Sequence, residues 1–379
     1  MKFKSIVFWL EYPLFHISPL IKSISEQSGL KTIVVCEKKI PQWRLDMGFV
    51  PPDFGVSDVY VEPTSKVRKR IEKTFSDKES VHIFHGLRGV KKNHKSFNTL
   101  TKELCSLGLY FEPSVFGGTP KGILRKQIYR VLFFKIKNHV DIMFALGNLG
   151  KDQYTKLGLA NHKVFSFPYF IDDDAIIDKT SIEEVSRDNN KSLSIYPKIK
   201  LLYVGQLIPT KNIPLLIKSF KQLVKSNKNI TLSIVGSGFL EDTLKQQVIK
   251  SGLEDRVHFL GKKSQAELKH MYQSHDIFIL PSRFDGWGAV SVEALANGLP
   301  VVISDRCGSA SIVKNQTHGV VFKSNSVKSL TKSLQLLINN IESYQSEQAY
   351  LERIAYVRHS LSASAGKKLF IKALANIKK

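Results

Sequence analysis

The sequence PSRFDGWGAVSVEALANGLP, residues 281–300, combines residue types that could hold the phosphate and hydroxyl groups of a ligand. Asp285 is followed by glycine, an aromatic residue and glycine, and Glu293 comes eight positions after Asp285 among small and apolar residues. Glycine lets the backbone approach a ligand closely, and a carboxylate accepts hydrogen bonds from hydroxyl groups. The stretch lies between two apolar runs, HDIFIL and PVVIS, so we expect strand, glycine-rich loop, short helix and strand.

Other glycines also follow apolar runs of strand length. They are Gly205 after LLYV, Gly236 and Gly238 after LSIV, Gly261 after HFL, and Gly286 and Gly288 after FIL. Ligands of doubly wound sheets bind at the carboxyl ends of the strands, and backbone N–H groups at helix starts attract phosphate. Each turn alone is equally consistent with a purely structural role. The four turns together favour a phosphate-bearing ligand.

The elements that must position these residues are strands alternating with amphipathic helices. The expected strands of the first half are FKSIVFWL, KTIVVC, VSDVYV, SVHIF, GLYFE, DIMFAL and KVFSF, and those of the second half are IKLLYVG, ITLSIVG, RVHFLG, HDIFILP, PVVIS and GVVF. This alternation indicates βαβ units and parallel sheets. Because 379 residues exceed the usual size of one core, the fold class predicted is α/β, with two doubly wound Rossmann-like domains.

The domain limits follow from the composition of the chain. We expect a first domain over residues 1–170, a polar and acid-rich linker over 171–198, a second domain over 199–360, and a C-terminal helix over 361–379 that packs back toward the first domain. Asp172, Asp173 and Asp174 have a spacing that could hold a divalent metal, but a solvated hinge explains them better. No His/Cys metal spacing is present, so we predict no metal requirement.

The second half resembles glycosyltransferase family 4, whose members have the GT-B fold. The resemblance rests on the Asp285 to Glu293 stretch with its following GLPVV, on YVGQLIPTKN, on VGSGFLEDTLKQ and on HFLGKKSQAEL, in the family's order. The first half matches only in pattern. The resemblance implies two domains facing each other across a cleft. It also implies retaining transfer of a sugar from a nucleotide-diphosphate sugar, UDP- or GDP-linked, with no metal and no further cofactor.

The resemblance also implies roles for particular residues. Lys211 would hold the diphosphate, Glu293 the ribose, and the loop from Asp285 to Gly288 the donor sugar. The donor-binding residues so implied are Gly205, Gln206, Lys211, Gly236, Gly238, Gly261, Lys262, Ser282, Arg283, Asp285, Gly286, Trp287, Gly288 and Glu293. Two positions depart from the family pattern, because Asp285 stands where Glu is common and Gln206 where Arg is common.

Two histidines of the first half follow expected strands. His16 and His85 could contact the sugar or orient the acceptor hydroxyl, although a structural hydrogen bond is as good an explanation for each. Together with Asp285, Glu293 and Lys211 they complete the predicted catalytic set.

The net charge of +23 indicates an anionic partner. In KGILRKQIYRVLFFKIK, residues 121–137, a helix would place Leu124, Ile128, Val131 and Leu132 on one face. The residues expected to face a membrane are Arg125, Lys126, Arg130, Phe133 and Lys137. A helix packed into the core explains the apolar face equally well. Arg88, Lys91, Lys92, His94 and Lys95 add a second cationic segment, expected to be a loop.

The expected location is the inner face of the cytoplasmic membrane, bound peripherally. No run of about 18 apolar residues is present, and three well-separated cysteines favour packing roles in a reducing compartment. The acceptor would be a glycan or lipid-linked, in bacterial polysaccharide, capsule or lipopolysaccharide assembly.

Two other functions compete with sugar transfer. A nucleotide-sugar 2-epimerase shares the fold, but the chain shows no dense set of acids and histidines for such chemistry. A nucleic-acid-binding protein would explain the charge, but no nucleic-acid-binding motif is present, so we expect no nucleic-acid partner. Ser264 and Glu267 have the spacing of a helix capping box and are assigned a structural role.

Overall fold

The computed structural model describes residues 2–45, 50–87, 90–117, 119–177, 199–227 and 229–377. Most of the expected linker, residues 178–198, and Arg88 of the cationic segment lie outside the described residues. Contacts within the chain separate two units, one made of residues 1–172 and 361–379 and the other of residues 173–360. The C-terminal segment therefore belongs to the first unit.

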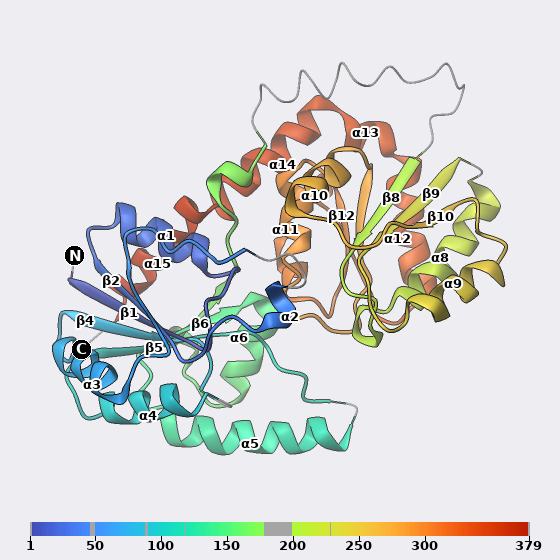
Figure 1. The fold of residues 1–379 in the computed structure, drawn as a ribbon. Helices are drawn as coiled ribbons and strands as arrows, with labels where there is room; N and C mark the ends of the chain where they lie inside the picture. The colour runs from blue at the N-terminus through green and yellow to red at the C-terminus, as the bar shows by residue number, and fades with distance from the viewer. Residues whose placement is uncertain are drawn as a thin grey trace. The chain divides into compact units, whose positions relative to one another are not determined.

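The first unit is built on a seven-stranded parallel sheet (Figure 1). Its strands are β1 (Ser5–Leu10), β2 (Lys31–Cys36), β3 (Asp58–Val61), β4 (Ser80–Phe84), β5 (Ser106–Phe111), β6 (Ile142–Leu146) and β7 (Val164–Phe167). Their order is β3-β2-β1-β4-β5-β6-β7, so the direction of winding reverses between β1 and β4. All seven strands were predicted. Four of them, β1, β4, β5 and β6, are buried along their whole length, as expected of strands covered on both faces.

Helices from both ends of the chain cover this sheet. They are α1 (Ser18–Gln27), α2 (Gln42–Leu45), α3 (Ser65–Thr74), α4 (Lys91–Leu100), α5 (Pro120–Ile136), α6 (Gly147–Lys156) and α15 (Ala363–Ala375). Phe370 of α15 stacks on Phe144 of β6 at 4.5 Å between ring centroids and lies 6.0 Å from Phe8 of β1. The last helix is thus part of the aromatic core of the first unit.

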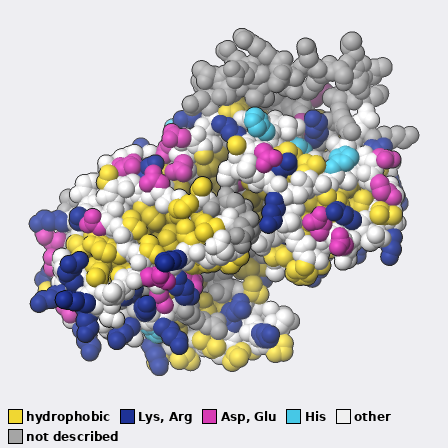
Figure 2. All heavy atoms as spheres, viewed as in Figure 1, with side chains coloured by type: hydrophobic (Ala, Val, Ile, Leu, Met, Phe, Trp, Pro, Cys, Tyr) yellow, Lys and Arg dark blue, Asp and Glu magenta, His cyan; other side chains and the backbone are white. Residues whose placement is uncertain are grey.

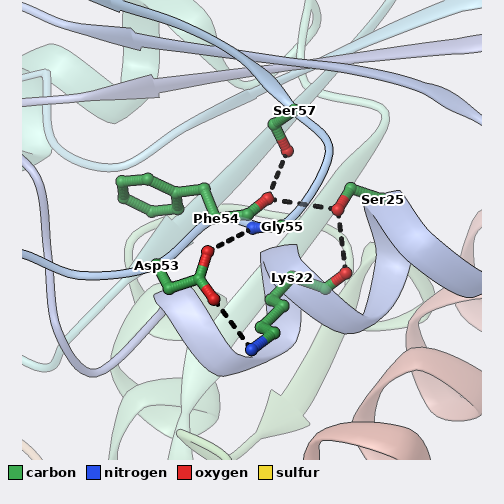
Figure 3. A network of polar contacts seen from close by, with 6 residues as sticks. All are labelled: Lys22, Ser25, Asp53, Phe54, Gly55 and Ser57. Atoms are coloured by element: carbon green, nitrogen blue, oxygen red, sulfur yellow. Dashed lines mark hydrogen bonds and ion pairs between the residues drawn. The ribbon is translucent and has the colours of Figure 1, made fainter.

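A network of polar contacts fixes the segment before β3 to α1 (Figure 3). Lys22 of α1 pairs with Asp53 at 2.8 Å, and Ser25 donates to the carbonyl of Phe54 at 3.1 Å. Asp53 also accepts from the backbone N–H of Gly55, whose φ of +62° and close approach to Ser25 leave no room for a side chain. These contacts hold α1, which begins two residues after His16.

The second unit contains a six-stranded parallel sheet. Its strands are β8 (Ile199–Val204), β9 (Ile230–Val235), β10 (Val257–Phe259), β11 (Ile277–Leu280), β12 (Val301–Ser304) and β13 (Gly319–Phe322), in the order β10-β9-β8-β11-β12-β13. Its helices are α8 (Ile213–Ser226), α9 (Glu241–Ile249), α10 (Gln265–Gln273), α11 (Val290–Ala296), α12 (Val327–Asn339), α13 (Ile341–Gln345) and α14 (Glu347–Ser360). The predicted capping box of Ser264 and Glu267 starts α10. The prediction of two doubly wound α/β domains is therefore confirmed.

The prediction for the faces of α5 was wrong. Leu124, Ile128 and Val131 are exposed, whereas Phe133, expected to project among basic residues, is fully buried. Phe133 packs between Phe111 and Tyr154 of the core, and the neighbouring Phe134 is the exposed aromatic residue. The helix has apolar residues on two faces, so a helical wheel alone could not show which one is buried.

Two further expectations can be compared with the structure. Lys91, Lys92, His94 and Lys95 do not form a loop but lie in the first turns of α4, where Asn93 and Phe97 point inward. The three cysteines are buried and not in disulfides, in agreement with packing roles. In the described part of the chain, no helix combines the length and apolar character needed to cross a membrane.

Candidate functional site

Two loops of the second unit meet where its sheet reverses direction, between β8 and β11. The loop after β8 carries Lys211 in a short 3-10 turn, and the loop after β11 carries Asp285. Lys211 Nζ donates to Asp285 Oδ2 at 2.5 Å. The strand order places both residues at the topological switch point, where doubly wound sheets bind ligands. We refer to this pair and its two loops as the Lys211–Asp285 site.

Backbone contacts hold the two loops of the site together. The N–H of Arg283 donates to the carbonyl of Thr210 at 2.8 Å, and its guanidinium Nε donates to Asn212 Oδ1 at 3.2 Å. Asn212 has a φ of +55°, a left-handed conformation that asparagine tolerates better than most residues. The cation and the carboxylate are therefore held by backbone that is fixed on both sides.

The loop from Asp285 to Gly288 is fixed on its other side by the segment after β12. Asp285 N–H donates to Arg306 O, Gly308 N–H donates to Asp285 O, and Ser309 N–H donates to Trp287 O, over 2.8–3.1 Å. Gly288 has a φ of +88°, and a Cβ there would lie 2.5 Å from Leu280. The predicted order of strand, glycine-rich loop and short helix is confirmed, and the side chain of Trp287 in the loop is buried.

The charge of Asp285 affects groups below the site. Lys211 and Asp285 have 22% and 14% of their side chains exposed, so solvent screens the pair only in part. Burial raises the pKa of Tyr203 well above its usual range, and the negative charge of Asp285 adds to this effect. Burial likewise raises the pKa of the Cys307 thiol, with a further contribution from Asp285. Both groups therefore stay protonated at physiological pH, and neither adds a charge to the site.

Glu293 lies in the first turn of α11 and is not the exposed helix acid that a surface position would give. Tyr272 of α10 donates its hydroxyl hydrogen to Glu293 Oε2 at 2.8 Å. Burial raises the pKa of Glu293, and the Tyr272 hydrogen bond opposes that shift. Among the described residues, Oε1 accepts no hydrogen bond. The carboxylate is thus oriented by one partner and keeps one oxygen for another donor.

The remaining predicted donor residues fall into two groups. Gly236 and Gly238 are needed for packing, because a Cβ at either would lie within 2.4 Å of a carbonyl oxygen of the loop after β8. Gly205 has a φ of +153° and lies over Tyr203, whose hydroxyl donates to Gln206 O. The other predicted residues are Gly261 and Lys262 at the end of β10, Ser282 buried after β11, and Gly286, whose carbonyl packs against Gly308.

His85 and His16 belong to the first unit, near the ends of β4 and β1. His85 Nε2 lies 3.0 Å from the Tyr169 hydroxyl, which donates its hydrogen to Glu112 Oε1 at 2.9 Å. Because Tyr169 has only one hydrogen to donate, His85 Nε2 must carry the hydrogen of its own bond. Burial, with a smaller contribution from His16, lowers the pKa of His85 to about 4. The ring of His16 stacks on that of Tyr169 at 5.6 Å.

A cavity of about 250 Å³ lies beside this hydrogen-bonded chain. His85, Glu112, Ser114, Tyr129, Leu132 and Tyr154 are among the residues that line it. Tyr129 and Leu132 come from α5, and the others from the ends of β4 and β5 or from α6. The cavity therefore combines polar groups with an apolar and aromatic wall, as small-molecule sites commonly do.

Lys211 and Asp285 were both predicted from the sequence as donor-binding residues, but their ion pair was not predicted. Tyr272, Tyr169 and Asn212 gave no signal, because their contacts join segments far apart in the chain. Glu112 could have been found, since it directly follows a buried strand just as His85 does.

Residues 185–358 match the family described as glycosyl transferases group 1. A glycosyltransferase of uncharacterised function from Haemophilus influenzae is 33% identical over 181 residues, which are 44% of this chain and 51% of the relative. The capsular polysaccharide biosynthesis glycosyltransferase CapM of Staphylococcus aureus is 27% identical over 169 residues, 42% of this chain and 43% of the relative. The chain thus spans about half the length of these curated relatives.

Solved structures resemble the chain over nearly its whole length. Anabaena HepE in complex with UDP gives a TM-score of 0.72 at 15% identity, covering 98% of this chain and 99% of that one. The lipopolysaccharide outer core galactosyltransferase WaaB gives a TM-score of 0.71 at 15% identity with the same coverage. At this identity the likeness shows the fold, which is the GT-B fold predicted from the sequence.

Proposed function

We propose that the protein is a glycosyltransferase that moves a sugar from a nucleotide-diphosphate sugar to a glycan or lipid-linked acceptor. The observation that carries the proposal is the Lys211–Asp285 site, a cation and a carboxylate fixed by backbone at the switch point of a parallel sheet. The match of residues 185–358 to glycosyl transferases group 1 supports the same function. It favours sugar transfer over an epimerase or a nucleic-acid-binding protein.

Each donor group has a partner in the second unit under this proposal. Lys211 binds the diphosphate, Glu293 accepts from the ribose through Oε1, and Asp285 accepts from a hydroxyl of the sugar. Because backbone hydrogen bonds already fix the loop from Asp285 to Gly288, the loop loses little conformational entropy when the donor binds. HepE was crystallised with UDP and with UDP-glucose, which favours a UDP-linked donor over a GDP-linked one.

The proposed reaction retains the configuration at the anomeric carbon. The bond from that carbon to the phosphate oxygen breaks, a bond to the acceptor oxygen forms on the same face, and the leaving phosphate takes the acceptor proton. The protein then needs no nucleophile, and its task is to position groups and stabilise charge. We propose that neither a metal nor a further cofactor takes part. The donor residues of the other glycine turns and Lys262, Ser282 and Arg283 keep their predicted supporting roles.

The acceptor is proposed to enter the cavity of the first unit. His85 is neutral there at physiological pH and, with Glu112, provides hydrogen-bonding groups for a sugar hydroxyl. The names of relatives in capsule and amylovoran biosynthesis favour a bacterial surface polysaccharide as the product. We propose that the enzyme works peripherally at the inner face of the cytoplasmic membrane.

Nucleotide binding followed by thermal unfolding tests the proposal. UDP should raise the melting temperature of the wild-type protein and of Lys218→Ala, which removes an exposed lysine of α8 in the same unit. Lys211→Ala should keep the fold but lose the shift. UDP-sugars with membrane extracts should then release UDP in the wild type and in Lys218→Ala, but not in Lys211→Ala. If no nucleotide diphosphate shifts the wild type, or if Lys211→Ala responds normally, the donor site is assigned wrongly.

A further inference from the structure

The outer face of α5 is an apolar stripe that the fold of the first unit does not use. Its members are Ile123, Leu124, Ile128, Val131 and Phe134, with 59%, 62%, 39%, 58% and 73% of their surface exposed. At 100° per residue they cover an arc of about 140°. The same helix is already anchored by its opposite side, where Gly122, Phe133 and Ile136 are buried.

Cations border this α5 stripe along both of its edges. Lys126 and Arg130 fall on one side of the arc, Lys121 falls on the other and Lys135 lies just inside that second edge; all four are exposed. Lys137 lies with its Nζ 5.2 Å from the centre of the Phe134 ring. The space-filling view shows apolar and basic side chains together along the lower edge of the first unit, where α5 runs in the ribbon (Figure 2).

The surroundings of the stripe select among possible partners. No acidic residue occurs between Glu112 and Asp141, so nothing in the helix neutralises its cations. A second copy of this face would bring two such cationic edges together, which is unfavourable. An anionic lipid leaflet, in contrast, complements the cations with its headgroups and the stripe with its acyl chains.

We propose that the outer face of α5 docks on an anionic lipid bilayer. The helix lies in the plane of the interface, with Leu124, Val131 and Phe134 inserted among the upper acyl chains and the bordering lysines and arginines at the headgroups. The proposal rests on the membrane location proposed above and not on the chemistry of sugar transfer. It also gives the cavity lined by Tyr129 and Leu132 a position directly behind the membrane-bound helix, where a lipid-linked acceptor could reach it.

Vesicle sedimentation with the full chain tests this docking face. The wild type should bind phosphatidylcholine vesicles that contain phosphatidylglycerol and bind pure phosphatidylcholine much more weakly, with the difference reduced at high salt. Phe134→Ser should weaken binding on the order of tenfold, and Lys126→Gln with Arg130→Gln on the order of twentyfold, since each cation near an anionic surface contributes about fivefold.

Matched variants separate a docking face from general surface effects. Phe239→Ser removes a phenylalanine of the second unit that is 76% exposed, and Lys221→Gln removes an exposed lysine of α8. Both should bind vesicles like the wild type, and UDP should shift the melting temperature of every variant equally. The proposal is overturned if Phe134→Ser binds as well as the wild type, or if neutral and anionic vesicles bind equally. It is also overturned if the wild type sediments as a dimer that Phe134→Ser converts to a monomer.

Discussion

Replacing Asp285 by Asn should strengthen the binding of UDP while it weakens sugar transfer. Asp285 pairs with Lys211 at 2.5 Å, so a diphosphate must compete with that carboxylate for the cation. Two unit charges about 4 Å apart interact by about 4 kcal/mol at an effective dielectric of about 20. The pair is 22% and 14% exposed, and solvent and rearrangement reduce this value. We therefore expect a gain of about 1–2 kcal/mol, or about fivefold to thirtyfold in Kd.

Titration calorimetry with UDP on four proteins measures the effect. These are the wild type, Asp285→Asn, Lys211→Ala and the double variant, which together form a thermodynamic cycle. Asp285→Asn should bind UDP more tightly, Lys211→Ala more weakly, and the gain from Asn should largely disappear without Lys211. Turnover of the UDP-sugar should still fall in Asp285→Asn, because the sugar loses a charged acceptor. Weaker UDP binding by Asp285→Asn, or an equal gain without Lys211, would refute this account of the site.

Two further predictions concern buried titratable groups. Because burial raises the pKa of Glu293, its folded-state pKa lies above the unfolded value and ionisation at pH 7 costs stability. Glu293→Gln should therefore unfold at a higher temperature than the wild type at pH 7, but not at pH 4, while kcat/KM falls on the order of tenfold or more. His82 accepts the indole N–H of Trp9 at Nδ1 and donates from Nε2 to Phe75 O, and burial lowers its pKa from 6.5 to about 4. Below pH 6.5 His82 is protonated in the unfolded chain but stays neutral in the native state. The free energy of unfolding therefore decreases as the pH falls, by about 3 kcal/mol at pH 4. Urea unfolding at pH 7 and pH 5 should show a smaller loss in His82→Leu than in the wild type, although the variant is less stable at pH 7; equal losses would contradict the assignment.

The central strands of both sheets could be predicted because they are buried on both faces. Strands such as SIVFWL and IFIL appear in the sequence as apolar runs that end at Glu11 and Pro281, and each is buried along its whole length. The Asp285 to Gly288 loop could be predicted equally well, because the positive φ of Gly288 requires glycine at that position. Constraints of this kind act within one short stretch of the chain, so the sequence of that stretch is enough to predict them.

The partners of the site residues could not be predicted in the same way. Tyr272 reaches Glu293 from a helix 21 positions earlier, and Tyr169 links residues of three strand ends that are adjacent only after the sheet has formed. Nothing in the composition of α10 or of the segment after β7 distinguishes these tyrosines from core residues. Their hydrogen bonds depend on the strand order, which the alternation of elements restricts but does not determine.

The composition of helix α5 correctly indicated an apolar and basic helix, but it did not show which of the apolar residues are exposed. Seventeen residues carry two apolar faces, and the basic residues are compatible with either face being exposed. Packing against the core determines which face is buried, because the ring of Phe133 packs against the rings of Phe111 and Tyr154. Once Phe133 is buried, the spacing of the helix forces Leu124, Val131 and Phe134 outward. The exposed stripe is therefore a consequence of packing in the first unit, and its cationic border is the part that packing does not require.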